Sequence, residues 1–117
     1  LKSVQTKAPI KSIGDGAFAY CGNLETVTLP DSVTSVGATS FYECTKLETV
    51  NLGNSVRSIG DNAFMLCTSL GSVTLPDSII SIGAGAFSSC TDLKSVTIPR
   101  ILGPSDLGVA TPRIVGL

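Results

Sequence analysis

The sequence predicts an α/β repeat solenoid, in which short parallel strands and short helical turns stack as successive coils. A 23-residue unit recurs four times without insertion, starting at Ser12, Ser35, Ser58 and Ser81. In every copy the apolar residues occupy the same places, and one such unit is too small to bury them alone. Stacking would bury them against the neighbouring copies. We therefore expect one right-handed stack of coils.

The apolar positions form columns that run through all the copies. One column holds only phenylalanine (Phe18, Phe41, Phe64, Phe87) and another holds only cysteine (Cys21, Cys44, Cys67, Cys90). Further columns consist of Ile, Val and Leu on either side of these two. We expect all of them to point into the core.

Each unit is expected to contain three local structures. Residues 27–29 alternate inward, outward and inward, which indicates a short strand that Pro30 ends. Residues 32–36 indicate a second extended segment on the far side. Ala17, Phe18 and Cys21 have a spacing that would place them on one side of a short helical turn. A glycine precedes this turn in every copy, which indicates either a positive φ or a close approach between coils.

The repeat pattern covers residues 1–99, as a partial first coil followed by four full units. Residues 1–4 match residues 93–96, so we interpret the chain as a fragment that starts within a repeat. From Arg100 to Leu117 the pattern stops, and Gly and Pro interrupt the sequence. The 100–117 segment is either a disordered tail or a cap, in which Ile101, Leu102 and Leu107 cover the last coil.

Composition and charge exclude several functions. The 117 residues, 43% of them hydrophobic, suit one small folded domain. A formal net charge of −1 gives no electrostatic reason to expect nucleic acid as a partner, and no apolar run is long enough to insert into a membrane. The sequence contains no histidine, so a Ser-His-Asp or Cys-His site cannot be built. We expect neither an enzyme nor a cofactor.

The motif IGxxAFxxCxxLxxVxLP, in register over four consecutive copies, resembles the BspA-type, or Treponema-type, leucine-rich repeat. Ser40 and Gly53 depart from the usual Ala and Pro. The resemblance implies a cell-surface or secreted protein that attaches to host proteins, other microbes or matrix. It also implies a non-catalytic, adhesin-like module that binds a protein or a glycan. A structural spacer and an accessory segment of a surface hydrolase remain alternatives.

Cysteine and carboxylate columns are the first candidates for chemistry. Four thiols at constant spacing could form a zinc site or disulfides, but paired Cys-x-x-Cys spacing is absent. We expect buried, reduced thiols and no metal site. Asp15 shares a column with Asp61, and Asp31 with Asp77; calcium binding is one interpretation, and turn formation is the one we favour.

The outward positions of the strands are the candidate ligand-binding face. They carry short polar side chains with almost no charge, at Thr26, Thr28, Thr49, Asn51, Ser72, Thr74, Ser95 and Thr97. We call this set the strand face. It is either an ordinary solvated sheet surface or the recognition surface of a leucine-rich repeat, and an ice-binding ladder is a distant third alternative.

Overall fold

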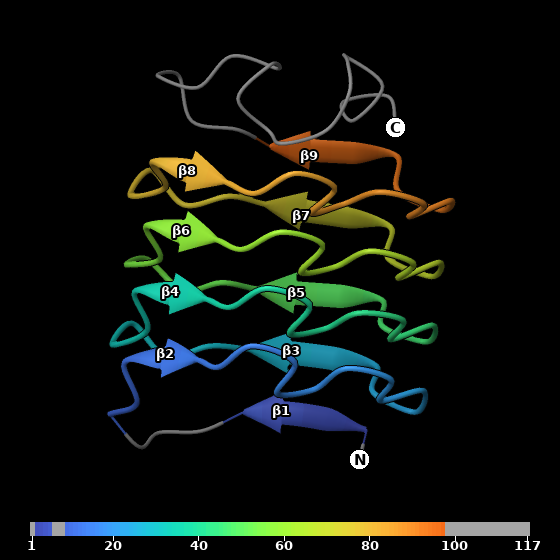
Figure 1. Ribbon diagram of the computed structural model, residues 1–117, viewed down its shortest axis with the longest axis horizontal. Coiled ribbons are helices and arrows are strands. Elements are labelled where there is room, and N and C mark those ends of the chain that lie inside the picture. The colour runs from blue at the N-terminus through green and yellow to red at the C-terminus, as the bar shows by residue number, and fades with distance from the viewer. Residues whose placement is uncertain (1, 6–8, 98–117) are drawn as a thin grey trace.

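The computed structural model describes residues 2–5 and 9–97. In this part of the chain, short strands alternate between two parallel sheets (Figure 1). The larger sheet has the order β1-β3-β5-β7-β9, with strands Ser3–Gln5, Thr26–Thr28, Thr49–Asn51, Ser72–Thr74 and Ser95–Thr97. The smaller has the order β2-β4-β6-β8, with strands Ser12–Ile13, Ser35–Val36, Ser58–Ile59 and Ser81–Ile82. The predicted solenoid of stacked coils is confirmed.

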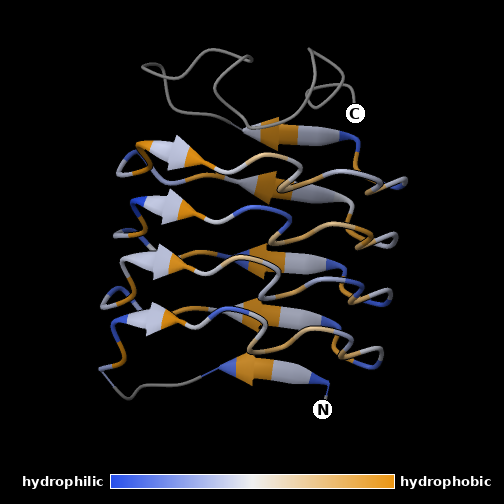
Figure 2. Cartoon of the chain, in the orientation of Figure 1, coloured by the Kyte–Doolittle hydropathy of each residue, from blue (hydrophilic) through white to orange (hydrophobic). Residues whose placement is uncertain are grey.

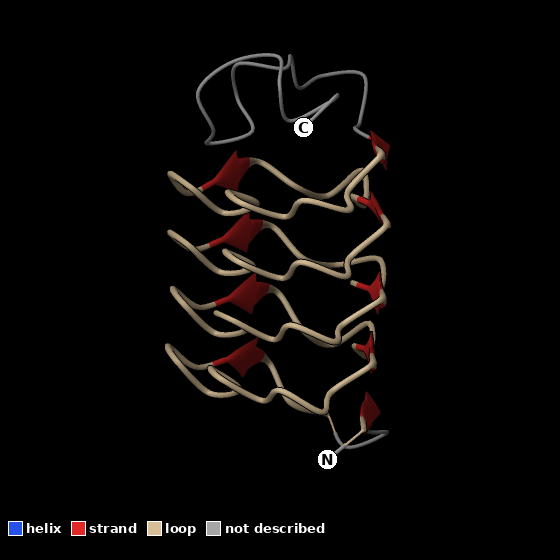
Figure 3. Ribbon diagram, turned by 90° about the vertical axis from the view of Figure 1, so that its right-hand side faces the viewer, coloured by secondary structure: helices blue, strands red, loops and turns tan. Residues whose placement is uncertain are grey.

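The register of both sheets follows the sequence repeat. In the larger sheet Val27 pairs with Val50, and Val50 pairs with Val73. In the smaller sheet Val36 pairs with Ile59. Equivalent residues of successive coils therefore lie directly over one another, and the two sheets occupy opposite sides of the stack (Figure 3).

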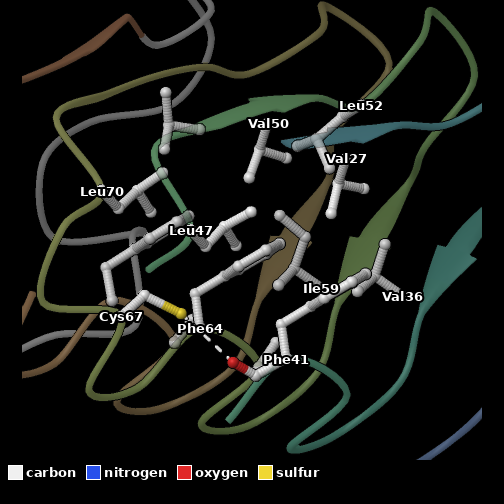
Figure 4. Close-up of a cluster of buried hydrophobic side chains, with 14 of the residues drawn as sticks. Val27, Val36, Phe41, Leu47, Val50, Leu52, Ile59, Phe64, Cys67 and Leu70 are labelled. Atoms are coloured by element: carbon white, nitrogen blue, oxygen red, sulfur yellow. Dashed lines mark hydrogen bonds between the residues drawn. The ribbon is translucent and has the colours of Figure 1, made fainter. Parts of the chain in front are cut away.

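The core lies between the two sheets and is filled by the predicted columns. Colouring by hydropathy shows apolar positions repeated at the same place in every coil (Figure 2). The four phenylalanine rings form one continuous stack, with centroids 5.1 to 5.4 Å apart and neighbouring planes within 11° of parallel. Figure 4 shows Phe41 and Phe64 of this stack among Val, Leu and Ile side chains. Such ring pairs add stability beyond that of the apolar area they bury.

The expected helical turn is wrong: no helix occurs among residues 2–5 and 9–97, and residues 15–20 form turns instead. The N–H groups of Gly16, Phe18 and Tyr20 donate to carbonyls of the next coil at 2.7 to 2.9 Å. An α-helix would bond these groups internally. The intervening N–H groups close turns within the coil, such as Ala17 to Gly14 at 3.2 Å. The segment is thus a further hydrogen-bonded ladder along the stack.

Left-handed backbone at two places in every coil makes this ladder possible. One place is occupied by Gly16, Thr39, Asn62 and Gly85, and the other by Tyr20, Glu43, Leu66 and Ser89, all with φ between 53° and 70°. Residues other than glycine adopt this conformation at a cost of about 1 kcal/mol or more. The ladder hydrogen bonds offset that cost in each coil.

The glycines before this segment at Gly37, Gly60 and Gly83 are explained by close approach and not by positive φ. A Cβ atom on Gly37 would lie 2.6 Å from Asp15 Oδ1 and 2.7 Å from Asp15 N, in the previous coil. Real Cβ atoms do not come this close, so the side chain has to be absent.

Both extended segments differ slightly from the prediction. The first strand is shifted by one residue, to Thr26–Thr28, although Leu29 is buried as expected. The second is reduced to the two residues Ser35–Val36. The boundary at residue 99 and both interpretations of residues 100–117 lie outside the described residues.

Candidate ligand-binding surface

The strand face lies on the larger sheet, where alternation along each strand turns its side chains away from the core. Thr26, Thr49, Ser72 and Ser95 are exposed, as are Asn51, Thr74 and Thr97, whereas Thr28 is half-buried. Register places them in two straight columns, in the pairs Thr26 with Thr49 and Thr28 with Asn51. At strand spacing of about 4.8 Å, they form a regular grid of polar groups.

The chemistry of this grid is that of neutral donors and acceptors. Hydroxyls can donate and accept hydrogen bonds, and short side chains lose little conformational entropy when a ligand orders them. Asn51 Oδ1 accepts from the N–H of Gly53 at 2.9 Å. Among the described residues, the other seven side chains make no hydrogen bond. Their polar atoms are available to a ligand.

The cysteine column lies inside the core and has a second role that the sequence did not reveal. Cys44, Cys67 and Cys90 are buried, and all four cysteines are free thiols, while Cys21 of the first coil is only half-buried. Each buried thiol donates to the carbonyl of a phenylalanine one coil earlier: Cys44 to Phe18 at 3.2 Å, Cys67 to Phe41 and Cys90 to Phe64 at 3.1 Å. The thiols therefore join successive coils.

Burial keeps these thiols protonated. Loss of hydration raises the pKa of Cys44 to about 11 and that of Cys90 to about 12. Burial also raises the pKa of Cys67, and the neighbouring thiols of Cys90 and Cys44 raise it further. A protonated thiol is the form that can donate to a carbonyl, and it is a poor metal ligand. Residues 2–5 and 9–97 contain no group of three potential metal ligands.

The carboxylate columns hold the turns of adjacent coils together. Asp15 Oδ1 accepts from the N–H of Ala38, and Asp61 Oδ1 from the N–H of Ala84, both at 2.9 Å. Asp31 Oδ1 accepts from the N–H of Asn54 at 3.0 Å. These bonds support the turn interpretation of the aspartates.

Two further surface features were missed by the sequence reasoning. A shallow groove of about 500 Å³ runs along the smaller sheet, lined by serines such as Ser58, glycines such as Gly60, and Asp15 and Asp61. The repeated Ser-Ile-Gly triplet was its only sequence signal. On the turn segments, Tyr20 and Tyr42 contact one another with ring centroids 5.4 Å apart and planes at 83°. Tyr20 is 67% exposed.

Parallel strands stacked in register over a core of repeated leucine, valine and phenylalanine define a leucine-rich-repeat solenoid with one open polar sheet. The sequence model described as the BspA type leucine rich repeat region matches residues 1–103 in six copies. The chain belongs to this family. None of the curated proteins compared with the chain matches it.

Solved structures agree with this assignment. A leucine rich cell surface protein from Faecalibacterium prausnitzii A2-165 is similar with a TM-score of 0.79 and 26% identity, over 92% of this chain and 30% of that one. The leucine rich repeat protein TpLRR of T. pallidum gives a TM-score of 0.58 and 33% identity, over 81% of this chain and 56% of that one. A leucine-rich repeat protein from Bacteroides capillosus gives a TM-score of 0.70 and 28% identity, over 82% of this chain and 74% of that one.

The chain thus spans under two thirds of the first two of these proteins. Proteins with BspA-type repeats are typically secreted or at the cell surface, their repeats are generally non-catalytic, and leucine-rich repeats generally mediate protein interactions. In the described part of this chain, no helix is long and apolar enough to cross a bilayer.

Proposed function

We propose that this chain is a non-catalytic binding module of a cell-surface or secreted, adhesin-like protein, and that the strand face binds a protein or glycan ligand. The observation that carries the proposal is the open grid of polar side chains on the larger sheet. These side chains are aligned by the pairing of β3, β5, β7 and β9, and in the described part of the chain only Asn51 among them makes a side-chain hydrogen bond. Family membership supports the surface location.

The grid favours weak binding that is multiplied over many coils. It lacks the Trp, Tyr and Arg anchors that dominate tight interfaces. Each coil adds the same pair of short polar groups, so a ligand with its own repeat can form equivalent contacts on successive coils. Linked weak contacts of this kind gain strongly from multivalency. A glycan chain or an extended peptide fits these requirements better than a compact small molecule.

The test replaces one column of the strand face by lysine. Thr28→Lys, Asn51→Lys and Thr74→Lys together place three bulky charges on consecutive strands, and all three positions face outward. The wild-type chain and this variant are compared on a glycan array and on immobilised extracellular-matrix proteins. We expect the variant to lose binding to any probe that the wild type retains, with unchanged circular dichroism.

The matched control places the same three charges on the smaller sheet, at Ser35, Ser58 and Ser81. These serines also occupy one column on consecutive strands. The control variant should bind as the wild type does. If it loses binding while the strand-face variant keeps it, the site lies on the smaller sheet. A chain that binds no probe in either array would favour the spacer alternative.

A further inference from the structure

The turn segments carry an aromatic and acidic patch that the strand-face proposal does not use. In one column of left-handed residues, Tyr20, Glu43 and Leu66 follow one another on successive coils. Tyr42 and Met65 stand beside them in the chain. We call Tyr20, Tyr42, Glu43, Met65 and Leu66 the turn-edge patch. It belongs to the ladder segment and is distinct from the strand face.

Backbone hydrogen bonds hold the patch in place. The N–H of Tyr20 donates to the carbonyl of Tyr42 at 2.7 Å, and the N–H of Glu43 donates to the carbonyl of Met65 at 2.9 Å. The edge contact between the two tyrosine rings further orients Tyr20. The Tyr20 ring is therefore positioned by the scaffold before any ligand arrives.

An aromatic ring and a carboxylate of the patch have complementary roles toward a cation. Tyr20 is 67% exposed, and its edge contact with Tyr42 covers at most one ring face. Glu43 is half-buried and occupies the neighbouring position of the same column, about one strand spacing along the stack. The backbone N–H of Glu43 donates to Met65, and its carboxylate makes no hydrogen bond with another described residue. An aromatic face beside a carboxylate attracts a cation by both cation–π and ion-pair interactions.

We propose that the turn-edge patch binds an arginine side chain of a partner protein. A guanidinium group is planar, so it can stack on the Tyr20 ring while its N–H groups donate to the Glu43 carboxylate. The aliphatic part of the arginine can lie along Leu66 and Met65, which are both half-buried and apolar. Along the stack, the ring and the carboxylate come first and the apolar side chains follow. An arginine side chain laid along the stack would place its guanidinium group at the first two and its methylene groups at the apolar side chains.

The chain itself supplies a specific probe of this site. It contains two tyrosines and no tryptophan, so its tyrosine fluorescence comes only from the patch. The intact chain is titrated with the peptide acetyl-Gly-Arg-Gly-amide and, in parallel, with the same peptide carrying citrulline. Citrulline keeps the shape of arginine without its charge. We expect the arginine peptide to change the fluorescence and the tyrosine ring NMR signals, with a Kd on the order of millimolar.

Variants then distinguish the contributions. Glu43→Gln and Tyr20→Leu should each weaken arginine binding about threefold or more, read from the NMR signals of the Tyr42 ring. Tyr20→Phe keeps a ring and should retain most of the binding. Asp92→Asn removes the same charge from an exposed position elsewhere and should change nothing. Circular dichroism confirms that each variant is folded.

Three results would overturn the proposal. Equal shifts with the arginine and citrulline peptides would make the patch an apolar surface without preference for a cation. A wild-type affinity in Glu43→Gln would remove the acidic group from the site. Absence of any shift at tens of millimolar peptide would show that no arginine site exists. None of these results bears on the strand face.

Discussion

The thiol of Cys67 donates a hydrogen bond to the carbonyl oxygen of Phe41 in the preceding coil, with 3.1 Å between sulfur and oxygen (Figure 4). The same carbonyl accepts the N–H of Cys44 within its own coil, at 3.3 Å. The Phe41 carbonyl therefore stabilises both a turn within its own coil and the contact with the next coil. The cysteine column acts as a hydrogen-bonded link as well as a small apolar filler.

This relationship predicts that Cys67→Ala lowers the free energy of unfolding by about 1 to 2 kcal/mol. The substitution removes both the thiol donor and the buried sulfur. The matched control is Cys21→Ala, because Cys21 is half-buried and lies in the first full coil. Urea unfolding followed by circular dichroism should show a clearly smaller loss for the control. Equal losses would mean that the thiol bond contributes little.

Alkaline pH should destabilise the fold through the same thiols. The pKa of an unburied thiol is 9.0, whereas burial raises the pKa of Cys44 to about 11 and that of Cys90 to about 12. Between these values the unfolded chain binds fewer protons than the folded chain, so the free energy of unfolding falls as pH rises. Below pH 8 the thiols should add no pH dependence.

The measurement is the urea midpoint at pH 8, 9.5 and 10.5 for the wild type and for Cys90→Ala. All other groups are the same in both proteins, so the comparison with the variant isolates the thiol contribution. The variant should show a shallower decline. A decline of the same steepness in both proteins would assign the effect to other groups.

The sequence predicted the parts of the fold that depend on repetition. Val27, Val50 and Val73 recur at one position, and stacking is the only way to bury such a column, so register and core followed directly. The turn segment was misjudged because a helix and a run of turns both place Phe18 and Cys21 on one side. Left-handed residues occur in the turns and would not occur in a helix. At Tyr20 and Leu66, however, the left-handed residue is not a glycine, so the sequence did not indicate it.

The outward orientation and the alignment of the strand-face side chains were also predictable from the sequence. Period-two alternation is enough to turn Thr26 and Thr28 away from the core, and the strand pairing aligned them. The turn-edge patch was not predictable, because Tyr20 and Tyr42 fall at different positions of the repeat. Their contact depends on the geometry of two successive ladder segments, which no single unit contains.

Ser40 predicts a stabilising substitution. It is fully buried in the column that holds Ala63 and Ala86, and its hydroxyl has no hydrogen-bond partner among residues 2–5 and 9–97. An unsatisfied buried hydroxyl costs about 1 kcal/mol or more. Ser40→Ala should therefore raise the free energy of unfolding by about 1 kcal/mol in urea titrations. The reverse change, Ala63→Ser, should lower it, and a stabilising Ala63→Ser would contradict this account.

The last prediction concerns the glycine column. In Gly60→Ala the new Cβ would lie 2.8 Å from Ala38 Cα and 2.8 Å from the carbonyl carbon of Gly37. Both are backbone atoms of the preceding coil, so the coils would have to separate. We expect a loss of about 2 kcal/mol in the free energy of unfolding, typical of overpacking.

Gly14 is the internal control, because it has the same place in the repeat and a Cβ there would meet nothing within 4 Å. Its φ is not positive, so alanine is compatible with its backbone. Gly14→Ala should leave stability unchanged or raise it by about 0.5 kcal/mol, because alanine restricts the unfolded chain. Thermal and urea unfolding of the two variants give the comparison. If both substitutions destabilise equally, the glycines are required by local backbone conformation, and close approach between coils is not their cause.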